Sequence, residues 1–389
     1  MPEINVRLVD LEDRTCLRLP DGFSRGTALI GFPRIAAKAN DGDVLLFGHS
    51  LFWEARETMR TFLGLGYDVD VIDLGAPAPQ AGGPYQVSLT LHHQLHMVEP
   101  VLAPGAIKIN WLTASNPPVR NARELQRIRA LEQRRNCRYA PKRQVLHVDA
   151  ELAAIEKADH CVLIGNQVTL DTYPKRWHHK IEPFCVSGAN IGHVKQPSAF
   201  IPSPREFVWF SASGAVMKGL DLLLEIFDKY ELPMLHVCGM VTQEEDFVDI
   251  YRTHLSGHPR IQVHGFLQGN DPKLAAIFDR CVAVVHPSAD EGMAGSVAHC
   301  LEVGLYPIIS RVTGIDLPRT CGRTLESCTE EEIVLAIADV LHAPEATLVQ
   351  EIATIQQMAL ERFSRASYSR RLREMFEKWL GPPPAAFSS

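Results

Sequence analysis

Two short stretches in the second half of the chain combine residue types that suit a phosphorylated sugar-like ligand. Lys218 follows a Ser/Gly loop and opens a helical pattern, so its ammonium group and nearby backbone N–H groups can meet phosphate oxygens. Glu291 ends an apolar run beside Gly292, where a carboxylate can accept hydrogen bonds from sugar hydroxyls. The helix that opens at Ser296 offers further N–H groups to an anion such as a diphosphate. We expect both stretches at the carboxyl edge of one parallel sheet, where such sheets bind ligands.

The elements around these residues alternate regularly between strand and helix. Residues 282–285 form a β-branched run typical of a buried parallel strand, and Gly304 is the predicted stop of the helix that begins at Ser296. Further strands are predicted over 207–210, 234–238, 261–264 and 306–309, and further helices up to 230 and over 244–254, 271–278, 330–341, 346–363 and 365–380. This alternation predicts a parallel sheet covered by helices.

The first half shows the same alternation, so the fold class is α/β. Residues 44–47 are predicted to be a strand, 52–65 a helix and 69–72 the next strand, which together make one βαβ unit, and residues 26–35 an apolar loop or short strand. Further strands are predicted over 85–91, 107–113, 160–164 and 180–186, with helices over 119–135, 149–157 and 166–173. The predicted domains are 1–190 and 207–365, with a linker over 191–206 and a C-terminal helix and tail over 366–389 that pack back on the first domain.

Histidines and aspartates in the first half allow alternative interpretations. His49 lies where the first predicted strand gives way to a helix, so it is either a ligand or catalytic contact or a local hydrogen-bonding residue. His92 and His93 follow another strand and have the same two interpretations, because no HExxH pattern completes a metal site. The Asp-x-Asp strings at 41–43 and 68–70 are predicted to be turn residues. We therefore expect no bound metal.

Composition and charge exclude several classes of protein. The chain of 389 residues has 46% hydrophobic and 22% charged residues and a formal net charge of −7, which does not favour nucleic acid as a partner. Nine cysteines without a CxxC spacing indicate reduced thiols, and no signal peptide or membrane-length apolar run is apparent, so we expect a cytoplasmic protein. The basic helix over 119–135 is either a solvated face or a contact for an anionic acceptor or lipid surface, which allows peripheral membrane association.

Taken together, the motifs of the second half resemble retaining glycosyltransferases of family 4, which have the glycosyltransferase B fold. The resemblance rests on five pieces: the strand, loop, Lys-Gly and helix of 207–227, Pro-Ser-x-x-Glu-Gly at 287–292, Gly-x-x-Pro-Ile-Ile-Ser at 304–310, Ile-x-x-His-Gly-Phe at 261–266, and Cys238-Gly239. It covers about 207–315, whereas the first half shares only the α/β alternation and the basic helix.

The resemblance implies two Rossmann-like domains that face each other across a cleft. It further implies a nucleotide-sugar donor, UDP- or GDP-linked, on the second domain, and an acceptor hydroxyl of a glycan, lipid-linked or small molecule on the first, with no metal and no separate cofactor. Glu291 would contact sugar hydroxyls and Lys218 the departing diphosphate, with His49 or His92 on the acceptor side. The remaining donor-binding residues implied are Ser213, Gly214, Gly239, Gly265, Phe266, Gly292, Met293, Ala294, Gly295, Ser296 and His299.

The sequence also departs from the family pattern in three places. His299 stands where the family usually has a glutamate that binds ribose, and Ser213 stands where it tends to have an arginine five residues before the lysine. Gly48-His49-Ser50 replaces the usual glycine pair after the first strand. Two alternatives therefore stay open: a nucleotide-sugar epimerase of the same fold, and a catalytically degenerate protein that binds a nucleotide sugar or a partner.

Overall fold

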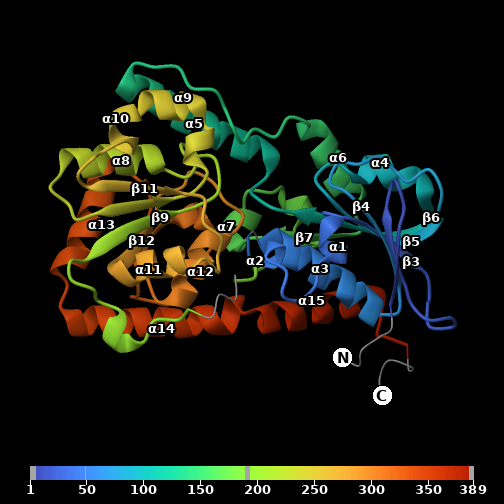
Figure 1. Ribbon diagram of the computed structural model, residues 1–389. Coiled ribbons are helices and arrows are strands. Elements are labelled where there is room, and N and C mark those ends of the chain that lie inside the picture. The colour runs from blue at the N-terminus through green and yellow to red at the C-terminus, as the bar shows by residue number, and fades with distance from the viewer. Residues whose placement is uncertain (1–5, 49, 189–192, 385–389) are drawn as a thin grey trace.

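The computed structural model describes residues 6–48, 50–188 and 193–384. Two α/β units lie side by side, and a pair of long C-terminal helices runs beneath both of them (Figure 1). Helix α14 (Glu345–Phe363) lies under the second unit, and α15 (Arg365–Leu380) continues under the first. Within the described ranges, none of the helices combines the length and the apolar character needed to cross a bilayer.

The first unit is built on an eight-stranded sheet of order β1-β2-β4-β3-β5-β6-β7-β8. From β4 to β8 the neighbouring strands are parallel, whereas β1 and β2 form an antiparallel margin. The strands are β1 (Arg7–Asp10), β2 (Thr15–Arg18), β3 (Thr27–Gly31), β4 (Asp68–Ile72), β5 (Tyr85–Leu91), β6 (Leu102–Leu112), β7 (His160–Ile164) and β8 (Ile181–Phe184). The helices are α1 (Ile35–Lys38), α2 (Leu45–Gly48), α3 (Ser50–Gly64), α4 (Leu95–Val98), α5 (Pro117–Arg135), α6 (Val148–Lys157) and α7 (Gln167–Leu170).

The second unit is built on a six-stranded sheet of order β11-β10-β9-β12-β13-β14 in which every pair is parallel. Its central strands are apolar runs buried on both faces, as parallel sheets covered by helices require. The strands are β9 (Glu206–Phe210), β10 (Leu235–Cys238), β11 (Ile261–Gly265), β12 (Cys281–His286), β13 (Tyr306–Ser310) and β14 (Arg323–Leu325). The helices are α8 (Leu220–Lys229), α9 (Glu245–Ile250), α10 (Arg252–Leu255), α11 (Pro272–Arg280), α12 (Gly295–Val303) and α13 (Glu330–His342).

The strand predicted over 44–47 is wrong, because these residues belong to α2 and the turn before it. Val44 is 60% exposed, whereas Ala28 and Ile30 of β3 are fully buried and supply the central strand instead. A run of four apolar residues fits a short helix as well as a strand, which is why the pattern misled.

Asp70 is a second correction, because it is not a turn residue. It lies within β4 and its buried carboxylate forms ion pairs with Arg14 and Arg18. The side chain of Tyr85 also donates a hydrogen bond to it, at 2.8 Å. A buried charge is tolerated when it is paired and hydrogen-bonded in this way, so Asp70 serves the packing of the first sheet.

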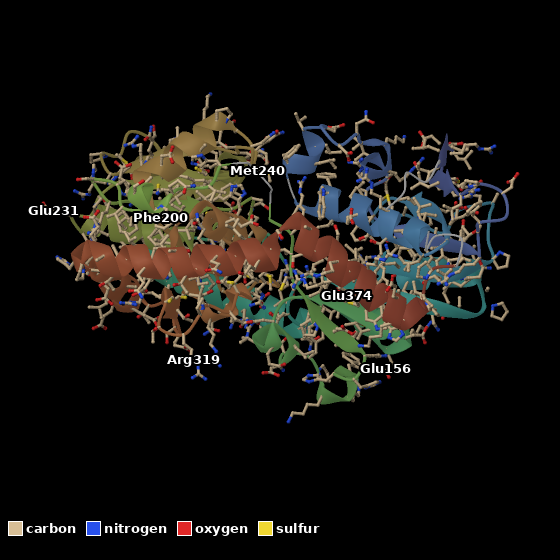
Figure 2. The ribbon with its side chains drawn as sticks, turned by 90° about the horizontal axis from the view of Figure 1, so that it is seen from below. Glu156, Phe200, Glu231, Met240, Arg319 and Glu374 are labelled. Carbon is tan, nitrogen blue, oxygen red and sulfur yellow. The ribbon has the colours of Figure 1, made fainter. Side chains whose placement is uncertain are left out.

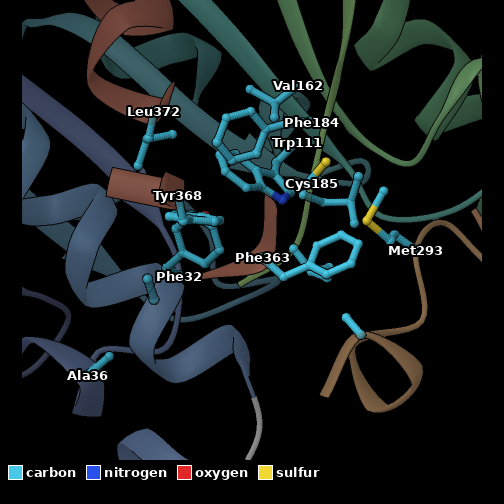
Figure 3. Close-up of a cluster of buried hydrophobic side chains, with 14 of the residues drawn as sticks. Phe32, Ala36, Trp111, Val162, Phe184, Cys185, Met293, Phe363, Tyr368 and Leu372 are labelled. Carbon is cyan, nitrogen blue, oxygen red and sulfur yellow. The ribbon is translucent and has the colours of Figure 1, made fainter. Parts of the chain in front are cut away.

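One hydrophobic cluster runs through both units and joins them to the C-terminal helices. Phe363 at the end of α14 and Tyr368 in α15 lie in it with Trp111 of the first sheet and Met293 of the second unit (Figure 3). Viewed from below, α14 and α15 run along the whole molecule (Figure 2). The two units therefore share part of their core, which fixes how the loops at their facing edges meet.

Candidate functional site

Lys218 and Glu291 form an ion pair at the carboxyl edge of the second sheet. Their side chains are 10% and 12% exposed. Lys218 lies in the turn between β9 and α8, and Glu291 lies in the loop between β12 and α12. Because β9 and β12 are parallel neighbours, the loops at their carboxyl ends emerge side by side. Residues that are roughly 70 positions apart in the sequence thus come into direct contact.

The close approach of the two loops depends on a glycine. Gly219 has a positive φ of 76°, and a Cβ there would lie 2.4 Å from the carbonyl oxygen of Pro287. Only glycine fits both the conformation and the space. The backbone N–H of Ala289 donates to the carbonyl of Met217 at 2.8 Å, which further ties the two loops together.

A buried histidine completes this cluster. His286 Nε2 lies 3.1 Å from Glu291 Oε1. Burial lowers the pKa of His286, so the ring is neutral, and a neutral ring whose Nε2 carries the proton donates to the carboxylate. Burial alone would raise the pKa of Glu291, but the Lys218 ammonium and the His286 hydrogen bond outweigh it and hold that pKa well below its usual range. The site therefore contains a fixed carboxylate beside a fixed ammonium group.

The Ser/Gly loop before Lys218 is already occupied by a carboxylate that the sequence did not reveal. Glu244 accepts hydrogen bonds from the N–H groups of Gly214 at 2.5 Å and Ala215 at 3.1 Å, and from the Tyr139 hydroxyl at 2.8 Å. The expectation that these N–H groups are available to phosphate oxygens is wrong for this conformation. In this conformation the oxyanion held by the loop is the Glu244 carboxylate, and the binding of a phosphate there stays a prediction.

The loop over 292–296 is divided between packing and the open edge. Gly292 lies against the first unit, because a Cβ on it would be 2.2 Å from the Thr113 carbonyl oxygen. Met293 and Ala294 are buried, and the Met293 side chain belongs to the shared core (Figure 3). Gly295 and Ser296 are half-buried in the first turn of α12, where backbone N–H groups have no partner inside the helix.

The structure places His299 among aromatic rings. Its imidazole is buried and meets Phe210 and Phe278 edge-on, with ring centroids 5.7 Å and 5.5 Å away. Burial lowers the pKa of His299 to about 3, so the ring is neutral. Its Nε2 has no hydrogen-bond partner among the described residues. The contact with ribose stays a prediction, and in this conformation the ring acts in packing.

The remaining predicted donor residues lie at the ends of β10 and β11. The N–H of Gly239 donates to the carbonyl of Gly265 at 2.8 Å, so the two loops are neighbours. Gly265 has a positive φ of 73° and turns the chain toward Phe266, whose side chain is 45% exposed. Ser213 lies in the loop after β9, near Lys218. The second sheet thus collects these residues along one edge.

His92 and His93, the described histidines predicted for the acceptor side, contact other residues of the first unit. His92, at the end of β5, pairs with Glu151 of α6 at 3.4 Å, and the ring of His93 lies 4.8 Å from that of His147. His49 lies outside the described residues. Among the residues that the structure describes, no three His, Cys, Asp or Glu side chains are grouped so as to hold a metal ion.

The basic helix α5 is not a solvated face, because it bridges to the second unit. Arg123 pairs with the buried Asp290 at 2.6 Å, Arg127 donates to the Pro287 carbonyl at 2.5 Å, and Arg134 pairs with Asp221 at 2.6 Å. The apolar side of α5 packs into the core of the second unit through Ile128. These three guanidinium groups therefore already have partners in the second unit and are not available to a membrane surface.

The architecture is the glycosyltransferase B fold, as the likeness to solved structures with that fold shows. Residues 205–343, which include Lys218 and Glu291, match the family model described as glycosyl transferases group 1. A search of curated protein sequences returned no significant match.

Among solved structures, the chain is similar to a sucrose-phosphate synthase from Thermosynechococcus elongatus, with a TM-score of 0.66 and 14% identity over 91% of this chain and 98% of that one. It is also similar to HepE of Anabaena, solved with UDP-glucose, with a TM-score of 0.60 and 12% identity over 91% and 100%. A glycosyltransferase from Rickettsia africae aligns with a TM-score of 0.56 and 10% identity over 92% and 99%.

Proposed function

We propose that the protein is a glycosyltransferase that moves a sugar from a nucleotide diphosphate sugar to an acceptor hydroxyl with retention of configuration. The observation that carries this proposal is the Lys218–Glu291 pair at the carboxyl edge of a parallel sheet. The match of residues 205–343 to the group 1 family supports it. UDP-linked donors are the first candidates, because a structurally similar protein was solved with UDP-glucose, and GDP-linked donors are the second.

In the proposed reaction the bond from the sugar's anomeric carbon to the diphosphate oxygen breaks, the acceptor oxygen bonds to that carbon, and the proton of the acceptor hydroxyl passes to the departing diphosphate. Negative charge then develops on the departing diphosphate. Lys218 and the N-terminal N–H groups of α12 stabilise that charge, and the Glu291 carboxylate orients a sugar hydroxyl. Donor binding exchanges the Lys218–Glu291 pair for these contacts, while His286 keeps Glu291 in place. We propose that neither a metal nor a separate cofactor takes part.

The acceptor side of the proposal rests on the first unit. His92, and His49 outside the described residues, stay candidates for contacts with an acceptor hydroxyl of a glycan, a lipid-linked sugar or a small molecule. We propose a cytoplasmic location, because the nine cysteines lack the spacing of a disulfide scaffold. Peripheral membrane contact through α5 is the weaker part of the proposal, since its arginines bridge the two units.

A catalytically degenerate nucleotide-sugar-binding protein is the second candidate. Two observations favour it: Glu244 fills the anion-binding loop at Gly214, and His299 packs between aromatic rings instead of facing the open edge. A protein of this kind binds the donor without completing transfer.

Incubation with a panel of UDP- and GDP-sugars, with and without candidate acceptors, separates these functions by following nucleotide release. We expect release that depends on an acceptor, and a loss of about 100-fold or more in Lys218→Ala and Glu291→Ala. Lys229→Ala, a change at an exposed lysine that pairs with Glu330, is the matched control and leaves the rate unchanged. Binding without release supports the degenerate protein, and isomerised sugar without release supports an epimerase. If both alanine variants transfer normally, the site is wrongly placed.

A further inference from the structure

Arg143 enters the Lys218–Glu291 site from the first half of the chain. It lies in the segment over 136–147, which connects α5 to α6 and extends over the second unit. The aliphatic part of its side chain covers Gly214, since a Cβ on that glycine would lie 3.0 Å from Arg143 Cγ. Arg143 Nη1 lies 3.5 Å from the hydroxyl oxygen of Ser213. The guanidinium therefore stands beside the loop that leads to Lys218.

The backbone of this segment is held firmly by the inner side of α5. The buried Glu124 accepts hydrogen bonds from the N–H groups of Lys142 at 2.9 Å and Arg143 at 2.7 Å. Asn121 makes a reciprocal pair with Val145, at 2.8 Å and 2.9 Å. Arg120 donates to the Arg143 carbonyl at 3.2 Å. These five hydrogen bonds hold the backbone of residues 142–145 in place, so the Arg143 side chain starts from a fixed position and not from a loose loop.

The Arg143 guanidinium makes few hydrogen bonds for a buried charged group. Its Nε is buried without a hydrogen-bond partner, and its one hydrogen bond, to Ser213, is long. None of the ion pairs among the described residues includes it. Burial and the neighbouring Arg120 lower the pKa of Arg143, against the attraction of Glu291, Glu124 and Glu244. A guanidinium has five N–H donors, so most of the donors of Arg143 are available to a ligand.

The carboxylates around Arg143 already have partners of their own. Glu124 and Glu244 already accept backbone N–H groups, and Glu291 is paired with Lys218. Burial lowers the pKa of Lys218, as does the field of Arg143, whereas Glu291 raises it. A ligand with two negative charges that binds between two neighbouring cations lowers the repulsion between them. A guanidinium also matches two phosphate oxygens at once.

We propose that Arg143 is the second cation of the diphosphate site, supplied by the first half of the chain to a donor that binds on the second. This inference rests on the proposed function and deepens it. It also accounts for Ser213: the arginine expected at that position of the loop is absent, and the Arg143 guanidinium occupies the adjacent space. Diphosphate binding is thereby coupled to the docking of segment 136–147 on the second unit.

The test is calorimetric titration of the full chain with UDP, GDP and the phosphate-free nucleosides. We expect Arg143→Ala to weaken binding of the preferred nucleoside diphosphate at least tenfold and to leave binding of its nucleoside unchanged. Arg143→Lys should retain part of the affinity. Arg138→Ala changes an exposed arginine of the same segment and should match the wild type. In the double variant Ser213→Arg/Arg143→Ala, a guanidinium returns from the second unit, and we expect most of the affinity to return with it.

The controls separate failure of this inference from failure of the proposed function. If Lys218→Met loses diphosphate affinity while Arg143→Ala stays within twofold of the wild type, Arg143 has no such role and the proposed site stands. If neither change matters, or if the wild type binds neither nucleotide, the site itself is wrong. Equal weakening of diphosphate and nucleoside binding in Arg143→Ala, with no recovery in the double variant, reduces Arg143 to a packing residue and overturns the inference.

Discussion

The two units are joined in two regions whose charges behave differently. One region, the ionic face, comprises the pairs Arg123–Asp290 and Arg134–Asp221, which cross between the units, together with the adjacent Lys218–Glu291 pair inside the second unit, so each of these carboxylates contacts a cation. The other, the junction of α14 and α15, holds the buried carboxyl groups of Glu54 and Glu302, neither of which has an ion pair among the described residues. Burial raises the pKa of Asp290 and of Asp221 as well, but their arginine partners oppose that rise, whereas the two junction carboxyl groups have no such partner and take up protons more readily.

Burial raises the pKa of Glu54 and that of Glu302 to about 7, although hydrogen bonds from Ser187 to Glu54, and Arg365 near both, oppose it. The Ser187 backbone N–H donates to Glu54 at 2.8 Å. The ionic face therefore aligns the proposed donor loops through specific ion pairs. The junction, in contrast, changes its charge near neutral pH, because its two carboxyl groups titrate there.

The largest effect should come from breaking a pair in the ionic face. Asp290→Ala leaves Arg123 without its partner and removes the acceptor of the Ser115 hydroxyl, so we expect a loss of about 3–5 kcal/mol in the free energy of unfolding. Urea unfolding measures it. The matched control, Asp339→Ala, removes an exposed pair with Arg323 and should cost about 1 kcal/mol or less. Equal losses in the two variants would contradict the assigned role of the ionic face.

The next effect should come from the junction and should depend on pH. Glu302 loses its proton near pH 4.5 in the unfolded chain but only near pH 7 in the folded protein. Between these two values the folded protein holds the extra proton, so its stability falls as the pH rises, and above about pH 7 this contribution is constant. We expect Glu302→Gln to gain up to about 3 kcal/mol relative to the wild type between pH 4.5 and 7.5. Unfolding curves at several pH values test it, with the exposed Glu374→Gln as control. A difference that stays constant with pH would contradict the raised pKa.

A smaller effect should come from the close backbone contact that Gly292 makes between the two units. Gly292→Ala places a Cβ 2.2 Å and 2.4 Å from the carbonyl oxygens of Thr113 and Ile164, and backbone cannot move aside as a side chain can. We expect a loss of about 1–3 kcal/mol in thermal unfolding and weaker nucleotide binding. Gly295→Ala, whose Cβ meets only the Ser50 hydroxyl oxygen at 3.6 Å, should leave stability within about 0.5 kcal/mol. Unchanged stability in Gly292→Ala would show that the units move apart freely.

The smallest effect on stability should come from Phe266 at the open edge. Its exposed ring contributes little to folding, so Phe266→Ala should change the free energy of unfolding by less than about 0.5 kcal/mol. If Phe266 contacts the donor, as the resemblance implies, the same variant binds UDP or GDP more weakly. Calorimetry and urea unfolding on one preparation compare the two quantities. A stability loss without an affinity loss would assign Phe266 to packing.

The fold class was predictable because the central strands of the second sheet are uninterrupted apolar runs. The contact between Lys218 and Glu291 follows from the same signal, since parallel neighbours bring their following loops together. The first sheet was harder: residues 44–47 resemble a strand in composition, and only burial distinguishes them from β3.

Contacts that depend on distant segments left no local signal. Glu244 is the first of three consecutive acidic residues at the start of α9, and nothing in its neighbourhood indicates that it binds the N–H groups of Gly214. Arg143 likewise lies in a basic, irregular segment, and its position near Lys218 results from hydrogen bonds to α5. The arginines of α5 could be read as a free surface because their carboxylate partners come from the other unit.

The central claim is that the Lys218–Glu291 pair marks the binding site for the donor diphosphate, and a crystal structure with bound UDP tests it most directly. We predict phosphate oxygens within hydrogen-bond distance of Lys218 Nζ, with the pair to Glu291 exchanged for ligand contacts. A nucleotide bound elsewhere, such as in the pocket between α5 and β14 that Arg127 and Arg311 line, with the Lys218–Glu291 pair intact, would contradict the account.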